Sequence, residues 1–370
     1  MEIRVIAGEG KLDAVGAAAR ACGISRALIV ADTGIVGAGF VARAARALEA
    51  SEVAVSYFHE FGPNPDTTMV EAGRARAAAE GVDGLVAIGG GSSLDCAKGI
   101  NFVLTNGGSM RDYRGHGKAT RPMLPSVGIP TTAGTGSEAQ SFAIISDAET
   151  HVKMACGDDK AAFRIVILDP VLTVSQPREV TAVAGYDAIS HAVEAYVTKS
   201  RTAASQDLAF EAWGLLGRHY ERVLQDPRDM AARGAMLLGA NRAGAAIELS
   251  MLGAAHACAN PLTARYGTTH GVAVAVMLPH VVRWNAEVVG ELYALLWPAG
   301  DLVSRLDQLA RAAGLPRSLT ELGVSRDDVD ALAADAATQW TGQHNPRPLD
   351  ARAARALYEA AFSPPIVLFQ

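Results

Sequence analysis

GLVAIGGGSSLDCAKGI, residues 84–100, is the stretch that decides the fold: a buried strand, three glycines, two serines and then a helix. The glycines at 89–91 allow the backbone to come close to a bulky ligand. The backbone N–H groups around Ser92 and Ser93 open the helix, and the positive end of its dipole suits a phosphate. A tight strand-to-helix turn would explain the same letters, so this stretch alone leaves phosphate binding and a purely structural turn open.

The segments on both sides of this stretch alternate between strand and helix patterns. Short β-branched runs such as EIRVIAG (2–8), RALIVAD (26–32) and SEVAVSYF (51–58) alternate with alanine-rich helical patterns such as 11–23, 39–50 and 68–81. This alternation predicts βαβ units on a mostly parallel sheet. From about Pro177 onward the chain reads as successive helices. We therefore predict a Rossmann-like α/β domain over 1–177 and an all-helical domain over 178–370, with a cleft between them.

Composition excludes several classes of function. The chain has 370 residues and a formal net charge of −6, without a lysine or arginine block, which argues against a nucleic-acid partner. We find no apolar run near the ~20 residues that span a bilayer, and the first residues lack the plan of a secretion signal. The four cysteines show no paired spacing and suggest reduced thiols. We expect a globular cytoplasmic protein that has no membrane partner.

A second loop strengthens the case for phosphate. GIPTTAGTGSEA, residues 128–139, follows another predicted strand and places Thr131, Thr132 and Thr135 among glycines. Hydroxyls and freely placed amides together make a polar cradle. Two such loops in one α/β domain favour a nucleotide as the ligand.

Asp32 stands just past the end of an early strand in RALIVADTGI. A carboxylate at this position can accept hydrogen bonds from an adenosine ribose, and it would repel a 2′-phosphate. Aspartate is also a good helix N-cap. Both interpretations stay open from the residues alone.

The helical half contains a candidate metal site. GYDAISHAVEAY (185–196) places Asp187 and His191 four residues apart on a predicted helix, so that both side chains lie on one face, and Glu194 follows three residues later. HACANPLTARYGTTH (256–270) begins with His256 and ends with His270. One carboxylate and three imidazoles suit iron(II) or zinc(II). The alternative to a metal site is that Asp187 and His191 form a surface pair and that His256 and His270 are structural histidines of the core.

Taken together, GGGSSLDCAKGI, GIPTTAGTGSE, GYDAISHAVEAY and HACANPLTARYGTTHGVAVAVMLPH resemble the iron-containing (group III) alcohol dehydrogenases. The resemblance implies the two-domain architecture shared with dehydroquinate synthase and an Fe(II), or sometimes Zn(II), ion. The implied metal ligands are Asp187, His191, His256 and His270. The resemblance places the cofactor pyrophosphate at Gly90, Gly91 and Ser92, with Asp95 nearby, and the nicotinamide side at Thr131, Thr132 and Thr135. It adds Lys153 and Leu172 to the cofactor pocket, and at Asp32 it implies NAD in preference to NADP.

The resemblance also implies an activity: hydride transfer between nicotinamide and a small alcohol or aldehyde held at the metal. It further implies a homodimer or a higher homo-oligomer. One position departs from the family pattern. Many members carry a further histidine four residues after the third ligand, where this chain has Asn260, and an amide cannot relay a proton. Asn260 therefore indicates a different proton path or a different substrate, and His344 is one candidate substitute for the missing histidine.

Three alternatives remain at this level. A lyase resembling dehydroquinate synthase would typically use one glutamate and two histidines, with many basic residues for an anionic substrate, whereas only Arg265 lies near these motifs. A metal-free enzyme resembling maleylacetate reductase would not need the complete ligand set. A non-catalytic nucleotide-binding scaffold would not need it either.

Overall fold

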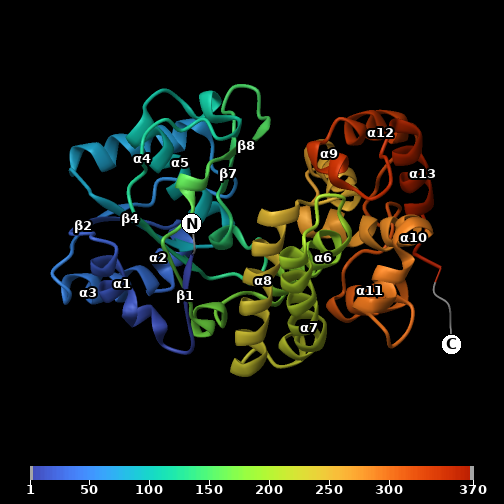
Figure 1. Cartoon of the computed structure of the whole chain (residues 1–370), viewed down its shortest axis with the longest axis horizontal. Helices are drawn as coiled ribbons and strands as arrows, with labels where there is room; N and C mark the ends of the chain where they lie inside the picture. The colour runs from blue at the N-terminus through green and yellow to red at the C-terminus, as the bar shows by residue number, and fades with distance from the viewer. Residues whose placement is uncertain (1–2, 367–370) are drawn as a thin grey trace. The chain divides into compact units, whose positions relative to one another are not determined.

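The structure is a computed structural model of the chain, and it describes residues 3–366. The chain forms two compact units, Met1–Ser175 and Gln176–Gln370 (Figure 1). The first is an α/β unit and the second is helical, so the predicted fold class is confirmed.

Unit 1 is built on six parallel strands in the order β1-β9-β6-β4-β2-β3. The strands are β1 (Arg4–Ala7), β2 (Arg26–Val30), β3 (Ala54–Phe58), β4 (Gly84–Gly89), β6 (Ser126–Pro130) and β9 (Ile165–Leu168). Every residue of β4, β6 and β9 is buried, as expected for the central strands of a parallel sheet that is covered on both faces. A smaller sheet joins β5 (Gly115–His116), β8 (Lys153–Gly157) and β7 (Phe142–Ser146).

The helices of unit 1 cover both faces of the large sheet. Figure 1 shows α4 and α5 on one face and α1 and α3 on the other. The helices are α1 (Val15–Ala21), α2 (Thr33–Gly37), α3 (Phe40–Glu49), α4 (Thr67–Ala79) and α5 (Gly91–Asn106), with 3-10 turns at Lys11–Ala14, Met110–Tyr113, Ser137–Ala139, Asp159–Ala161 and Pro170–Thr173. Because β2, β4 and β6 are parallel neighbours, the loops after them meet at one edge of the sheet. That edge carries Asp32, the glycines at 89–91 and the threonine loop.

Unit 2 consists of eight α-helices within the described residues. They are α6 (Arg178–Val197), α7 (Ala203–Gln225), α8 (Met230–Ser250), α9 (Ala254–Tyr266), α10 (His270–Leu296), α11 (Leu302–Ala313), α12 (Val329–Ala337) and α13 (Ala351–Ala361), with 3-10 turns at Arg326–Asp328 and Trp340–His344. Helix α6 is the central one: it packs against α7, α8 and α10, and every residue from Gly185 to Val197 is buried. A helix that is apolar all round belongs in the core.

Helix α10 is long and apolar. Within the described part of the chain it is the one helix long and apolar enough to cross a membrane by length and composition. In the structure 61% of its apolar window is buried inside the fold, so packing against the neighbouring helices accounts for its apolar side chains.

Candidate active site

Three imidazoles of unit 2 converge on one carboxylate oxygen. Oδ1 of Asp187 lies 3.5 Å from Nε2 of His191, 3.6 Å from Nε2 of His256 and 3.8 Å from Nε2 of His270. Ligand atoms of Asp187, His256 and His270 all lie within 4.8 Å of one another. The rings follow the same arrangement, since His256 lies between the other two with centroid separations of 5.0 and 5.3 Å. The residues that the sequence analysis singled out as ligands are therefore neighbours.

The geometry of this cluster suits a metal ion. The atoms facing one another are too far apart for good direct hydrogen bonds, and Oδ1 of Asp187 and Nε2 of His256 are buried without any hydrogen-bond partner. Buried polar atoms without partners are rare, and a bound ion is one explanation for them. Four donors around an ion at the usual Zn–N distance lie about 3.4 Å apart, close to the separations seen here. Asp187, His256 and His270 therefore fit a divalent first-row metal, and Nε2 of His191 lies 3.5 Å from the same oxygen of Asp187.

The electrostatics of the cluster also favour a cation. Burial raises the pKa of Asp187, but the surrounding imidazoles lower it more, so that its pKa lies well below the usual range. Burial lowers the pKa of His256, yet the carboxylates of Asp187 and Glu194 raise it to about 9. The lowered pKa keeps Asp187 in its carboxylate form, and the raised pKa of His256 means that positive charge is stabilised beside that carboxylate. A proton on His256 or a metal ion can supply that charge.

The helices fix where each ligand lies. Asp187 and His191 are one turn apart on α6, so both side chains leave the same face. His256 lies in the first turn of α9, and His270 is the first residue of α10. Gly271 allows this close approach, because a Cβ there would stand 2.6 Å from the carbonyl oxygen of Val183 on α6. The beginning of α10 therefore lies directly on α6, and His270 lies beside Asp187.

Glu194 is part of the site and does not lie on the polar surface. Its Oε2 is 2.6 Å from Nδ1 of His256, and its Oε1 accepts a hydrogen bond from the N–H of Ala255 at 2.7 Å. The sequence analysis left its role open. It missed Asn345, whose Oδ1 accepts from the N–H of Ala254 at 3.1 Å. The only sequence signal for Asn345 was the run HNPRPLD (344–350), which has no helical or strand period.

Asn260 and His344 have separate partners. Asn260 lies one turn after His256 on α9 and donates from Nδ2 to Oε1 of Gln339 at 3.0 Å. Nδ1 of His344 instead lies 2.8 Å from Oγ of Ser200. The contacts of His344 therefore give no support to its being a substitute for the missing histidine. Gln339 is a neighbour of Asn260 that sequence reasoning did not identify.

In unit 1, Asp32 is the N-cap of α2. Its Oδ1 accepts from the N–H groups of Gly34 and Ile35, and its Oδ2 accepts from Oγ of Ser93 at 3.0 Å. Asp32 is therefore held at the start of two helices, α2 and α5. The cap interpretation is confirmed, and the ribose interpretation stays a prediction because one carboxylate can serve both.

The two polar loops of unit 1 pack against each other. A Cβ on Gly91 would stand 2.9 Å from Oγ1 of Thr135, and one on Gly90 would stand 3.3 Å from Cγ2 of Thr132. The loops thus meet where α5 begins, and Gly90 as N-cap leaves the first N–H groups of α5 without a side-chain cap. Orphan N–H groups at a helix start suit an anion.

A third segment, the loop before α4, reaches the same edge of unit 1. The N–H of Asn64 donates to Oγ of Ser92 at 3.2 Å, and Nζ of Lys153 donates to Oδ1 of Asn64 at 2.8 Å. Asn64 therefore links the start of α5 to the lysine of β8. Sequence reasoning named Ser92 and Lys153 but missed Asn64, because loop residues carry no period.

Two expected cofactor residues have structural roles in unit 1. Asp95 accepts from Oγ of Ser137 at 2.5 Å and from the N–H of Ile144 at 3.2 Å, and the Nζ of buried Lys98 lies 3.8 Å away. One oxygen of Asp95 thus holds Ser137, at the end of the threonine loop, and the other holds β7. Leu172 is completely buried in the core of unit 1, so its side chain offers no exposed surface to a ligand. That result argues against the expectation that Leu172 lines the cofactor pocket.

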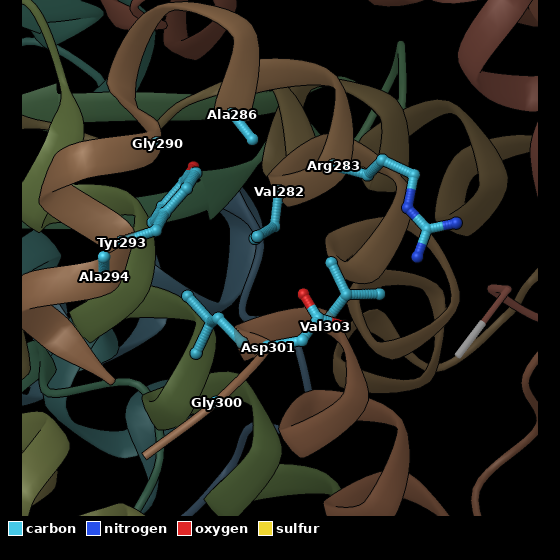
Figure 2. Close-up of a pocket in the computed structure, with 10 residues that line it drawn as sticks. Val282, Arg283, Ala286, Gly290, Tyr293, Ala294, Gly300, Asp301 and Val303 are labelled. Atoms are coloured by element: carbon cyan, nitrogen blue, oxygen red, sulfur yellow. The ribbon is translucent and has the colours of Figure 1, made fainter. Parts of the chain in front are cut away.

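Unit 2 also contains a pocket of about 290 Å³ lined by residues of α10 and α11 (Figure 2). Its walls include Val282, Tyr293 and Leu302, and Arg283 stands at one side with its guanidinium turned away. None of the four ligand candidates lines it. This pocket is therefore distinct from the metal cluster.

Comparison with known proteins agrees with the geometry. Residues 3–170 match the family model for iron-containing alcohol dehydrogenase, and residues 181–362 match its Fe-containing alcohol dehydrogenase family C-terminal model. The chain is 34% identical over 356 residues to the NAD-dependent methanol dehydrogenase of Bacillus methanolicus, covering 92% of this chain and 93% of that protein. A solved 1,3-propanediol oxidoreductase superposes with a TM-score of 0.94 at 31% identity, covering 97% of this chain and 98% of that one. A maleylacetate reductase from Agrobacterium tumefaciens superposes with a TM-score of 0.83 at 26% identity, covering 97% and 96%. The chain therefore belongs to the iron-containing alcohol dehydrogenase family of oxidoreductases.

Proposed function

We propose that this oxidoreductase is an NAD(H)-dependent alcohol dehydrogenase or aldehyde reductase that uses Fe(II) or Zn(II). The metal ligands are Asp187, His191, His256 and His270. The observation that carries the proposal is the convergence of three Nε2 atoms within 3.5–3.8 Å of one buried, unpartnered carboxylate oxygen. The substrate is a small alcohol or aldehyde, as the name of the methanol dehydrogenase relative suggests.

Different residues of the chain have different roles in this proposal. When bound, the metal supplies a Lewis acid that polarises the oxygen of an alcohol or aldehyde. A bound nicotinamide would accept or donate the hydride of the substrate carbon. The start of α5, with Gly90, Gly91 and Ser92, holds the pyrophosphate, and Asp32 holds the adenosine ribose. We assign Thr131, Thr132, Thr135 and Lys153 to the nicotinamide side.

Asn260 limits how the proton moves. Its amide can hold a substrate hydroxyl by a hydrogen bond, but it cannot accept the proton that alcohol oxidation releases. The proton therefore leaves through water or a cofactor hydroxyl in this proposal. Activity should then lack a pH-dependent step that titrates at residue 260.

The alternatives fit less well. A metal-free reaction like that of a maleylacetate reductase leaves the orphan atoms of Asp187 and His256 without an explanation. A lyase resembling dehydroquinate synthase needs basic residues for an anionic substrate. The nearest candidate, Arg265, is already paired with Asp335 at 2.7 Å. Binding of NADP is disfavoured by the carboxylate of Asp32.

Metal analysis combined with a cofactor assay tests the proposal. Protein purified anaerobically should contain about one Fe or Zn per chain, and adding either metal to stripped protein should raise its melting temperature by linkage. NADH oxidation with aldehydes of differing length and charge should exceed NADPH oxidation. Metal below about 0.1 per chain, with no thermal gain on adding metal, would sink the metal assignment.

Two further expectations accompany the proposal. We propose a homodimer or higher homo-oligomer, which light scattering on the purified protein tests. We also propose that the protein works in the cytoplasm, where its four free cysteines stay reduced. Localisation of a tagged chain in cells tests the second expectation.

A further inference from the structure

Glu194 is a buried carboxylate with an unusual set of partners. It lies in the last turn of α6, one turn after His191, and is 3% exposed. In the part of the chain that the structure describes, its ion pair is with His256 and not with a lysine or an arginine. A buried carboxylate is costly unless specific partners compensate for its lost hydration. The partners of Glu194 therefore show what the residue does.

One oxygen of Glu194 fixes the ring of His256. The 2.6 Å contact from Oε2 to Nδ1 is that of a charge-assisted hydrogen bond in which Nδ1–H donates. With the proton on Nδ1, the lone pair of His256 is on Nε2, the atom that faces Asp187 at 3.6 Å. The carboxylate thus selects both the tautomer and the direction of the ring.

The other oxygen of Glu194 fixes the backbone that carries His256. Helix α9 begins at Ala254 after the N-cap Gly253, which has no side chain to bond the first N–H groups. Glu194 and Asn345 replace the missing cap, since they accept from the N–H groups of Ala255 and Ala254. A Cβ on Gly253 would stand 2.9 Å from an oxygen of each. The backbone and the ring of His256 are therefore held by the same carboxylate.

Asn345 is itself held on a second side. Its amide exchanges hydrogen bonds with the amide of Asn285 on α10, at 2.9 and 3.0 Å, and it also donates to the carbonyl of Arg347 at 2.9 Å. The start of α9 is thus anchored to α6 through Glu194 and to α10 through Asn345. Both anchors are on helices that also carry metal ligands.

We propose that Glu194 is a positioning residue that sets the affinity of the metal site by orienting His256. The inference rests on the proposed function and deepens it. Outer carboxylates of this kind typically change metal affinity by about 10–100-fold. The role is separate from capping α9, because capping alone would not require the contact to Nδ1.

The test measures metal affinity without using activity. Apo protein is titrated with Zn²⁺ against a chromophoric chelator, for wild type and for Glu194→Gln. The amide keeps the shape of the side chain and an oxygen for the N–H of Ala255, but it loses the charge at Nδ1. We expect the Zn²⁺ Kd to rise about 10–100-fold. The visible spectrum of the Co²⁺-loaded variant should also differ from that of wild type.

Asp307→Asn is the matched control. Asp307 is also a carboxylate of unit 2 that is 3% exposed, and it bonds Arg311 and Arg317 rather than a metal-ligand candidate. This variant should lose stability while its Zn²⁺ Kd stays within about 3-fold of wild type. If Glu194→Gln behaves like this control, with lower stability and unchanged Kd, Glu194 is only a cap and the proposal is overturned.

A measurement on wild type covers the case in which the variant does not fold. Ring ¹⁵N spectra of the Zn²⁺-loaded protein should show His256 with its proton on Nδ1 and the metal on Nε2. A Zn²⁺-loaded His256 with its proton on Nε2 and the metal on Nδ1 would overturn the proposal. Failure of wild type to bind any metal would instead refute the proposed function and this inference with it, so the two failures are distinguishable.

Discussion

Asn260 donates a hydrogen bond from Nδ2 to Oε1 of Gln339 at 3.0 Å, one helical turn after the ligand candidate His256. The side chain at position 260 is therefore oriented by a partner and not by solvent alone. Its own carbonyl oxygen can also accept a hydrogen bond. This relationship makes position 260 a place where substrate choice and proton path can be tested.

Asn260→His should change both properties. An imidazole loses the amide contact to Gln339 and introduces a group with an ordinary pKa near 6.5. We expect kcat/KM for alcohol oxidation to gain a dependence on pH near that value, and the ranking of aldehydes in reduction to change. Gln339→Ala is the control, because it removes the partner without adding a titrating group. Identical pH profiles and substrate ranges for wild type and Asn260→His would show that the departure is neutral.

Asp187→Asn should abolish tight metal binding. An amide carries no charge, so the variant loses the anion that faces Nε2 of each of the three imidazoles. The loss in metal affinity should exceed the ~10–100-fold typical of an outer hydrogen-bond partner. In a thermal melt, Zn²⁺ at about 100 times the wild-type Kd should stabilise wild type by about 2.7 kcal/mol and the variant far less. An equal gain for both would remove Asp187 from the ligand set. His219→Ala, a histidine on α7 outside the cluster, should keep the wild-type gain.

Asp32 can be tested with two substitutions that separate charge from capping. Asn keeps the N-cap oxygen and removes the charge, whereas Gly removes both. If the carboxylate binds the ribose, both variants should reduce the ratio of kcat/KM with NAD to kcat/KM with NADP. Only Gly should also cost stability, by a few tenths of a kcal/mol for the lost cap. Asp350→Gly, which removes the cap of α13, should lower stability and leave the preference unchanged. A preference that neither Asp32 variant alters would leave Asp32 as a cap only.

The fold was predictable because its signals are local. The apolar run before Gly89 and the period of α3 are written in consecutive residues, and the parallel sheet follows from their alternation. The grouping of the four candidate ligands was predictable for a different reason. Asp187 and His191 share a helix face, but His256 and His270 joined them only through the family resemblance, since spacing alone cannot bring α9 and α10 together.

The partners of those residues were not predictable from the sequence. Gln339 and Asn345 lie 79 and 91 positions from the residues they bond, in segments without a helical or strand period. The burial of Leu172 was missed because a leucine can line either a protein core or the wall of a pocket. Long-range pairing and burial are properties of the packed chain, so they became visible only in the structure.

Asp147 should make unit 1 sensitive to acid. Its side chain accepts two hydrogen bonds from Arg111, and Oδ1 also accepts from the N–H groups of Glu149 and Thr150. Hydrogen bonding to Arg111 lowers the pKa of Asp147 well below its usual range. A carboxyl whose folded pKa is depressed contributes stability above its unfolded pKa, near 3.9, and loses that contribution as the pH falls toward the folded pKa.

Asp147→Asn should therefore have a lower urea midpoint than wild type at pH 7, and the difference should shrink below about pH 4. The exposed Asp159→Asn serves as the control and should follow wild type at every pH. A difference between wild type and Asp147→Asn that stays constant from pH 7 to pH 3 would mean that packing, and not the charge of Asp147, stabilises this part of unit 1.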